Sequence, residues 1–333
     1  MHEPKILFLI QHPDLPSSRV RVLDLVPTLR EQRLDITVET YPSGLRNKIH
    51  CFRKLRNWDA VVLQKKLSSP IESLFLRLCS RRLLYDFDDA VYRHHETAGK
   101  RNHFSRALKF KTIARLAHQI IAGNETLAQA VRPYNRHVSI IPSAVPIAGI
   151  PQHDYSSTAQ SCVIGWVGGA INLSQLQLLQ PVLANLHQRH DLEFRVLCSE
   201  SIDMHPVPTT FIPWDLATQA KEIAQFDIGV MPLPEGEHAN GKCGFKALQY
   251  MAAAVPPVVS DTPVNRQIIA HEREGFVANN WQAFEQYLET LITQPALRRQ
   301  LGHAARKKVE TSYSLPVVGQ KLADILLHPP EEK

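Results

Sequence analysis

Two lysines, Lys242 and Lys246, stand four residues apart in a stretch that leads into an apolar, periodic segment. A loop that opens a helix at 241–244 would present free backbone N–H groups to an anion, and lysines at this spacing would share one face of the turn. Because cations oppose the helix dipole at a helix N-terminus, their presence favours an anionic ligand such as a diphosphate. The alternative is a solvated lysine pair.

Three carboxylates, Asp86, Asp88 and Asp89, stand at the end of an apolar run. Carboxylates in an Asp-x-Asp pattern can bind Mg²⁺ or Mn²⁺, since hard cations prefer oxygen ligands. A second interpretation places Asp88 or Asp89 at a strand end facing a cleft, where it accepts a hydrogen bond from a substrate hydroxyl. A third is a helix N-cap, a position that Asp occupies well.

Arg19 and Arg21 lie at the start of the first expected helix, just past the first expected strand. Two arginines there could bind a substrate phosphate through paired N–H donors, and a surface pair is the alternative. The same half of the chain is basic: residues 1–150 hold 24 Lys and Arg against 13 Asp and Glu. This charge suggests a phospholipid surface, a lipid diphosphate or nucleic acid as partner, or only a solvated basic face.

Basic helices are expected around 53–56 and 100–115. They could rest on anionic lipid, with Phe104, Leu108 and Phe110 as apolar contacts, or they could cover a core. No apolar run approaches the roughly 20 residues that span a bilayer. Five scattered cysteines, without CxxC or Cys/His ligand spacing, argue against a disulfide framework and structural zinc. A reducing cytoplasm is the simplest compartment.

Short apolar runs alternate with amphipathic periodic segments along the whole chain, which predicts doubly wound parallel α/β sheets. In the first half, strands are expected at 5–11, 36–41, 59–64, 82–87, 119–122 and 138–141. In the second half, strands are expected at 161–167, 193–197, 210–212, 227–231, 257–260 and 275–277. The pattern predicts an N-terminal domain over 1–145, a Pro- and Ser-rich linker over 146–160 and a C-terminal domain over 161–314. A C-terminal helix and tail over 315–333 could pack back on the N-terminal domain.

Six segments in order resemble family 4 glycosyltransferases, the large retaining group with the GT-B fold. Along the chain, the segments are YDFDDA (85–90), IAGN (121–124) with IIP (140–142), FDIGVMPL (226–233), GKCGFK (241–246), LQYMA (248–252) and VPPVVS (255–260). The resemblance extends to a subgroup with a DFDDA segment and a GKCGFKxLQYMA segment. It implies two Rossmann-like domains facing across a cleft, metal-independent transfer with retention of configuration, and a donor site in the C-terminal half.

The resemblance also implies roles for individual residues of the C-terminal half. The loop at Gly168 and Gly169, with Asn172 after it, would lie near the donor diphosphate. Ser199 and Trp214 end two strands at the same rim and would flank the nucleotide base. A tight strand-to-helix turn and simple packing of the tryptophan are the respective alternatives.

One departure concerns two glutamates that the family usually carries eight positions apart. This chain has Gly241 and Gln249 at those places. Gln249 can still bind a ribose or sugar hydroxyl, but it brings no charge. Glu235 or Glu237 in the preceding loop could supply another acid. Otherwise the chain is an inactive binding partner on the same fold.

We therefore expect transfer of a sugar from a nucleoside diphosphate, UDP favoured over GDP, to a hydroxyl of a glycan, a lipid-linked molecule or another acceptor. Such an enzyme would serve cell-envelope glycan synthesis from the cytoplasm or the inner face of the membrane, without a cofactor. A specific nucleic-acid binder is disfavoured, because no aromatic stacking array or helix-turn-helix is recognisable. An NAD-dependent oxidoreductase is a poor fit, because no GxGxxG follows the first strand.

Overall fold

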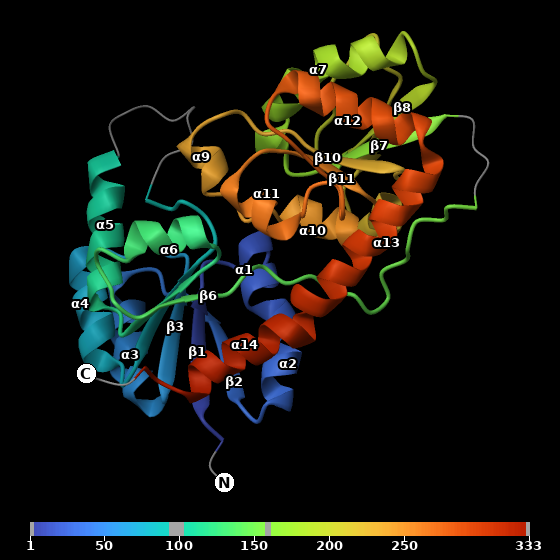
Figure 1. Cartoon of the computed structure of the whole chain (residues 1–333). Coiled ribbons are helices and arrows are strands. Elements are labelled where there is room, and N and C mark those ends of the chain that lie inside the picture. Colours follow the sequence, from blue (N-terminus) through green and yellow to red (C-terminus); the bar gives the residue numbers. More distant parts are fainter. Residues whose placement is uncertain (1–2, 93–102, 157–160, 331–333) are drawn as a thin grey trace. The chain divides into compact units, whose positions relative to one another are not determined.

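The computed structural model describes residues 3–92, 103–156 and 161–330 (Figure 1). The chain divides into two compact units. The N-terminal unit comprises Met1–Ala144, Gly241–Cys243 and Ser314–Lys333, and the C-terminal unit comprises Val145–Asn240 and Gly244–Tyr313. Residues 146–160, expected as a linker, group with the C-terminal unit. Each unit is built on one six-stranded sheet.

The sheet of the N-terminal unit is parallel throughout, with strand order β2-β1-β3-β4-β5-β6. Its strands are β1 (Lys5–Ile10), β2 (Asp35–Thr40), β3 (Ala60–Gln64), β4 (Leu83–Phe87), β5 (Gln119–Ala122) and β6 (Val138–Ile140). Its helices are α1 (Pro16–Arg21), α2 (Val26–Glu31), α3 (Leu45–Lys54), α4 (Pro70–Cys79), α5 (His103–Leu116), α6 (Glu125–Val131) and α14 (Leu315–Leu327). Strands β3 and β4 are buried at every position, as expected for a parallel sheet covered on both faces.

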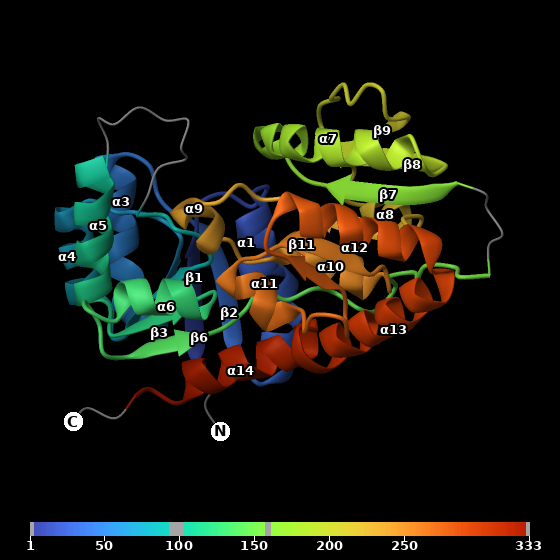
Figure 2. The same cartoon turned by 45° about the horizontal axis from the view of Figure 1, so that its top comes forward.

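Successive residues of each strand point to opposite faces and so feed two separate cores. On one face, Leu7 and Leu9 of β1 pack with apolar side chains of α3 to α6. On the other face, Ile6 and Phe8 pack with α2 and α14 (Figures 1 and 2). The close approach of α14 to α2 requires a glycine, because a Cβ on Gly319 would lie 2.6 Å from a side-chain carbon of Thr28.

The sheet of the C-terminal unit is also parallel, with strand order β12-β11-β10-β7-β8-β9. Its strands are β7 (Cys162–Val167), β8 (Leu192–Cys198), β9 (Thr209–Pro213), β10 (Ile228–Met231), β11 (Pro257–Ser260) and β12 (Phe276–Ala278). Its helices are α7 (Ser174–His187), α8 (Gln219–Ile223), α9 (Glu237–Asn240), α10 (Phe245–Ala252), α11 (Pro263–Ile268), α12 (Trp281–Thr293) and α13 (Pro295–Ser312).

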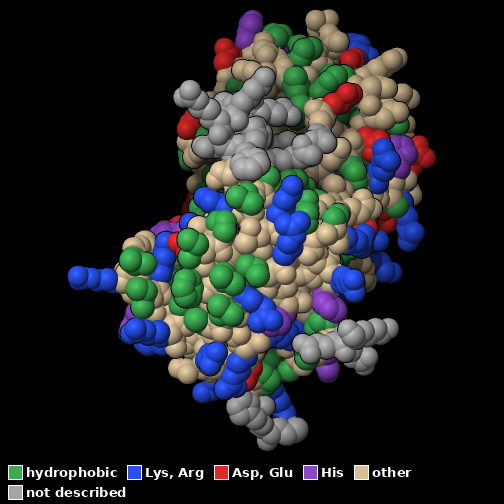
Figure 3. Space-filling model, turned by 90° about the vertical axis from the view of Figure 1, so that its left-hand side faces the viewer, with side chains coloured by type: hydrophobic (Ala, Val, Ile, Leu, Met, Phe, Trp, Pro, Cys, Tyr) green, Lys and Arg blue, Asp and Glu red, His purple; other side chains and the backbone are tan. Residues whose placement is uncertain are grey.

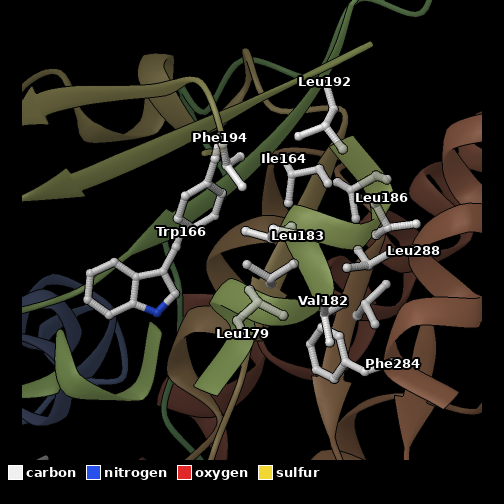
Figure 4. Close-up of a cluster of buried hydrophobic side chains, with 14 of the residues drawn as sticks. Ile164, Trp166, Leu179, Val182, Leu183, Leu186, Leu192, Phe194, Phe284 and Leu288 are labelled. Carbon is white, nitrogen blue, oxygen red and sulfur yellow. The ribbon is translucent and has the colours of Figure 1, made fainter. Parts of the chain in front are cut away.

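The main core of the C-terminal unit lies between the sheet and helices α7 and α12 (Figure 4). Ile164 and Phe194 extend from β7 and β8 toward Leu183 of α7 and Phe284 of α12. On the opposite face, the buried Tyr250 of α10 donates a hydrogen bond to the carbonyl of Val230 (3.0 Å), and its hydroxyl also accepts one from the N–H of Val167 (3.1 Å). Tyr250 thereby fixes α10 against β7 and β10.

Several helices differ from the sequence prediction. The helix expected at 19–32 is broken into α1, a short 3-10 turn over Leu23–Leu25 and α2. The break precedes Pro27, whose missing N–H is tolerated only in the first turn of a new helix. Helix α3 covers 45–54, whereas the prediction placed a basic helix only around 53–56. Helices α9 and α11 were not predicted. No helix in the described part of the chain is both long and apolar enough to cross a bilayer.

Candidate functional site

The order of strands singles out one edge in each sheet. In the C-terminal unit the chain runs outward from β7 to β9, then returns to place β10 on the other side of β7. In the N-terminal unit the same reversal falls between β1 and β3. Ligands of open α/β sheets bind outside the carboxyl ends of the strands at such a reversal. These two edges are therefore where the residues singled out in the sequence should be sought.

At the edge of the C-terminal sheet, three predicted donor residues follow neighbouring strands. Gly168 follows β7, Ser199 follows β8 and Trp214 follows β9. Gly168 donates its N–H to the carbonyl of Leu197 (3.1 Å), and Trp214 donates its N–H to the carbonyl of Cys198 (2.8 Å). Parallel pairing thus brings the three positions to one rim, with the indole of Trp214 partly exposed.

Lys246 lies beside the turn at Gly168. It occupies the first turn of α10, and its Nζ stands 5.4 Å from the ring centroid of Trp166, a cation–π distance. A Cβ added to Gly168 would lie 2.9 Å from Cε of Lys246 and 2.5 Å from the Trp166 ring. Glycine at 168 therefore leaves room for the lysine stem at the point where β7 gives way to its loop.

Lys242 does not share a helical face with Lys246, so that prediction was wrong. Helix α10 begins at Phe245, and Gly244 ahead of it has a left-handed backbone (φ 68°). Residues 241–243 group with the N-terminal unit, where Asn124 donates a hydrogen bond to the carbonyl oxygen of Lys242 (3.0 Å). The left-handed backbone of Gly244 separates Lys242 from the helix, which begins only at Phe245.

Gln219, which the sequence analysis missed, joins two predicted donor residues. Its Oε1 accepts hydrogen bonds from the indole N–H of Trp214 (3.2 Å) and from Nε2 of Gln249 (3.2 Å). Gln219 is the first residue of α8 and is buried. Because both groups donate to the same buried oxygen, Gln219 fixes the orientation of the Trp214 indole and of the Gln249 amide at the same time. No sequence motif marks a glutamine for this role.

Asn172 ends a short 3-10 turn, Ala170–Asn172, which follows Gly169. Its N–H bonds to the carbonyl of Gly169 (2.9 Å), and its Oδ1 accepts from Nε2 of Gln175 (3.3 Å). The side-chain amide nitrogen of Asn172 and the hydroxyl of the exposed Ser199 remain at the rim as polar groups that a ligand could meet.

A cavity of about 460 Å³ occupies the other half of the same edge, beyond β10, β11 and β12. Glu235, one of two acids considered as substitutes for the family glutamates, lines it together with Ser260, Asp261 and Trp281. Ser260 accepts a hydrogen bond from the N–H of Leu233 (2.8 Å), which fixes the loop that carries Glu235. Glu237 lies in α9, and its side chain is outside the described part.

In the N-terminal unit, Arg21 is buried rather than exposed at a rim. It is 4 % exposed, pairs with Asp86 of β4, and donates to the carbonyl of Ile141 (2.6 Å). Burial opposes the guanidinium charge, but Asp86 beside it holds the pKa of Arg21 above its ordinary value. The expectation that Arg21 binds an acceptor phosphate is therefore not supported, whereas Arg19 stays partly exposed. Asp86 in an otherwise apolar strand was the available signal for a buried cation.

Asp88 and Asp89 share a lysine that the sequence analysis missed. Nζ of Lys65 lies 3.0 Å from Oδ1 of Asp88 and 3.7 Å from Oδ2 of Asp89. Burial works against the ammonium charge, yet the two carboxylates raise the pKa of Lys65. Lys65 follows β3 and adopts φ 59°, a backbone that turns it toward the end of β4. In the described residues no three His, Cys, Asp or Glu side chains group to hold a metal ion.

The apolar side chains expected as membrane contacts in the basic helix at 100–115 differ in their exposure. Phe110 is buried in the core and cannot touch a membrane, whereas Leu108 is exposed. The side chain of Phe104 and residues 100–102 lie outside the described part.

Comparison with known proteins gives a family match in the second half of the chain. A model of the family described as "Glycosyl transferases group 1" matches residues 223–308, which hold α10 and Gln249. Among curated protein sequences, none matches this chain.

Solved glycosyltransferase structures share the fold over nearly the whole chain. Sucrose-phosphate synthase from Thermosynechococcus elongatus is 12 % identical, with 97 % of this chain and 98 % of that one covered at a TM-score of 0.72. Anabaena HepE, in complex with UDP and glucose, is 13 % identical, with 98 % and 100 % covered at 0.72. The lipopolysaccharide outer core galactosyltransferase WaaB is 11 % identical, with 98 % and 99 % covered at 0.68. The chain thus has the GT-B fold, and its residues 223–308 match the model of group 1 glycosyl transferases.

Proposed function

We propose that this protein transfers a sugar from a nucleoside diphosphate donor to a hydroxyl acceptor. The observation that carries the proposal is the meeting of Gly168 and Lys246 at the reversal between β7 and β10. Of these, Lys246 and β10 lie within residues 223–308, the region that matches the glycosyltransferase family. At that place, backbone N–H groups of a turn and the ammonium group of a lysine lie at the carboxyl ends of parallel strands, an arrangement that suits a diphosphate.

The donor diphosphate is bound by Lys246 and by backbone N–H groups of the turn at Gly169, Ala170 and Ile171. The ammonium group of Lys246 neutralises charge that develops on the departing diphosphate, and it does so in the transition state, where stabilisation accelerates the reaction. The ring of Trp166 holds the lysine stem in place.

The nucleoside is bound by Trp214, Ser199 and Gln249. The partly exposed indole of Trp214 offers a face for base stacking, and Gln249 presents its amide to ribose or sugar hydroxyls. Gln219 preorganises both. UDP is the first donor nucleotide to test, because the structural neighbour HepE was crystallised with UDP and with UDP-glucose.

The acceptor hydroxyl is met by Asp88 and Asp89. Lys65 lies within ion-pair distance of both carboxylates, and an oxygen of either one can accept the hydroxyl's hydrogen bond. Transfer proceeds with retention of configuration and without a metal, as in the family 4 subgroup that the sequence resembles. A glycan or lipid-linked acceptor at the inner face of a membrane, reached from the cytoplasm, fits the basic N-terminal half; WaaB, a structural neighbour, is a lipopolysaccharide galactosyltransferase.

A catalytically inactive binding protein on the same fold is the second candidate. It is favoured by Gly241 and Gln249, which stand where the family usually has glutamates. Glu235 at the 460 Å³ cavity is the acid that would compensate in an active enzyme. Nucleotide binding without sugar transfer to any of a panel of acceptors would favour this candidate.

A thermal-shift screen with UDP, GDP, ADP and CMP tests the proposal. At a hundredfold excess over the dissociation constant, the preferred nucleotide should stabilise the fold by about 2.7 kcal/mol. Lys246→Ala should lose most of this shift, and Lys221→Ala, which removes an exposed lysine of α8, should keep it. If no nucleotide shifts the wild type, or if both variants respond alike, the donor-site assignment fails.

A further inference from the structure

Helix α4 exposes a row of large apolar side chains. Ile71, Leu74, Phe75 and Leu78 are 69, 45, 51 and 57 % exposed, and we name these four residues the α4 stripe. Their spacing, i, i+3, i+4 and i+7, places them on one face of the helix. The opposite face is already used by the core, where Ser73 and Leu76 are buried. The α4 stripe is thus a second apolar face, turned outward.

The neighbouring helices extend this surface. Leu45 and Ile49 of α3 and Leu108 of α5 are exposed as well. These three helices therefore carry seven of the fourteen exposed large apolar side chains found among the described residues. Figure 3 shows this side of the N-terminal unit, with apolar side chains gathered together and Lys and Arg around them. Apolar side chains so concentrated mark an interaction surface.

The charge around the α4 stripe has one sign. The sequence of α3, α4 and α5 contains nine basic residues: Arg46, Lys48, Arg53, Lys54, Arg77, Arg106, Lys109, Lys111 and Arg115. Their one acidic residue is Glu72, which is bound by Lys48 (2.6 Å) and caps the start of α4. A surface with apolar side chains inside a basic surround complements an anionic membrane, which offers hydrocarbon beneath phosphate.

A second, independent feature lies at the C-terminal end of α4. A pocket of about 640 Å³ is lined by Arg77, Arg81, Arg82, Arg115 and Arg136, and by no acidic residue of the described chain. Arg82 is committed to the fold through carbonyls of α14, and Arg81 pairs with Asp59. Arg77 and Arg136 have no carboxylate partner in the described residues. Guanidinium groups gathered in this way suit phosphate.

We propose that the N-terminal unit docks on anionic phospholipid through the α4 stripe, with lipid phosphates received by the arginine pocket. The apolar side chains enter the boundary between headgroups and acyl chains. The basic residues of α3, α4 and α5 are attracted by the negative potential at the membrane surface. Docking of this kind does not depend on sugar transfer, so it stands or falls separately from the proposed function.

Cosedimentation with vesicles tests the proposal. Vesicles of phosphatidylcholine alone are compared with vesicles that contain one third phosphatidylglycerol. The wild type should partition at least about tenfold more strongly to the anionic vesicles at about 0.1 M salt, and the advantage should shrink at about 1 M salt. Phe75→Ser/Leu78→Ser should weaken partition about tenfold or more, because two large apolar contacts are lost.

Two matched controls complete the design. Ile171→Ser removes an equally exposed apolar side chain from the C-terminal unit and should leave partition unchanged. Arg77→Gln/Arg136→Gln should weaken binding about fivefold per arginine, whereas Arg299→Gln, at an exposed site of the C-terminal unit, should not. Unfolding curves confirm that each variant is folded.

Several outcomes would overturn the proposal. These are equal binding to neutral vesicles, partition of the stripe variant like the wild type, or loss of binding in the controls alone. Absence of vesicle binding together with a concentration-dependent dimer that the stripe variant abolishes would show instead that the α4 stripe joins two copies of the chain.

Discussion

The buried pair of Arg21 and Asp86 allows a sharp test of whether Arg21 is structural. Asp86→Ala would leave a guanidinium that is 4 % exposed with only the carbonyl of Ile141 as a partner. Removing one partner of a buried ion pair typically costs about 3–5 kcal/mol. We expect the same range here, because Asp86 accepts from both Nε and Nη2 of Arg21. Since a domain is stable by only about 5–15 kcal/mol, this is a large fraction of the total.

Urea unfolding of the wild type, Asp86→Ala and the double variant Arg21→Met/Asp86→Leu measures the effect. The double variant removes both charges and fills their volume, so it should recover most of the loss. Asp59→Ala, which removes the carboxylate of the exposed pair with Arg81, should cost about 1 kcal/mol or less. A loss below about 1 kcal/mol for Asp86→Ala, or a double variant as unstable as the single one, would refute the structural role and restore Arg21 as a candidate ligand-binding residue.

Three further predictions concern the C-terminal unit. Gln219→Ala should weaken UDP binding about five- to thirtyfold in calorimetry, because it frees two side chains that its amide oxygen holds. Gly168→Ala should abolish the UDP-induced thermal shift, because the added methyl would lie 2.9 Å from Cε of Lys246. Burial alone would raise the pKa of Asp227, but His153 and other partners outweigh it and lower that pKa. The resulting stability is present above about pH 4 and is lost as the pH falls below it, so Asp227→Asn should flatten the decline in unfolding free energy between pH 5 and pH 3.

The strand order along the chain was predictable, because parallel strands buried on both faces appear as short apolar runs. The prediction of helices failed where a proline or a glycine interrupts the expected pattern. Pro27 split one expected helix, and the left-handed Gly244 separated Lys242 from α10. Only the C-terminal end of helix α3 was predicted, because the outward face of the helix carries Leu45 and Ile49 and so blurs the usual amphipathic pattern.

Gly168 and Trp214 could be placed at the rim from the sequence, because each follows a strand directly. Lys65 and Gln219 were missed, because their roles depend on partners that the fold brings close, such as Asp88 for Lys65 and Gln249 for Gln219. Arg21 was misassigned for the same reason: a sequence does not show which carboxylate a buried guanidinium will meet.

Calorimetry of UDP and of uridine with wild type and Lys246→Ala tests the central claim most directly, since the two ligands differ by the diphosphate alone. If the diphosphate binds at Lys246, the variant should lose about ten- to a hundredfold in affinity for UDP and less than about twofold for uridine. Equal losses for both ligands, or unchanged affinity for UDP, would contradict the account.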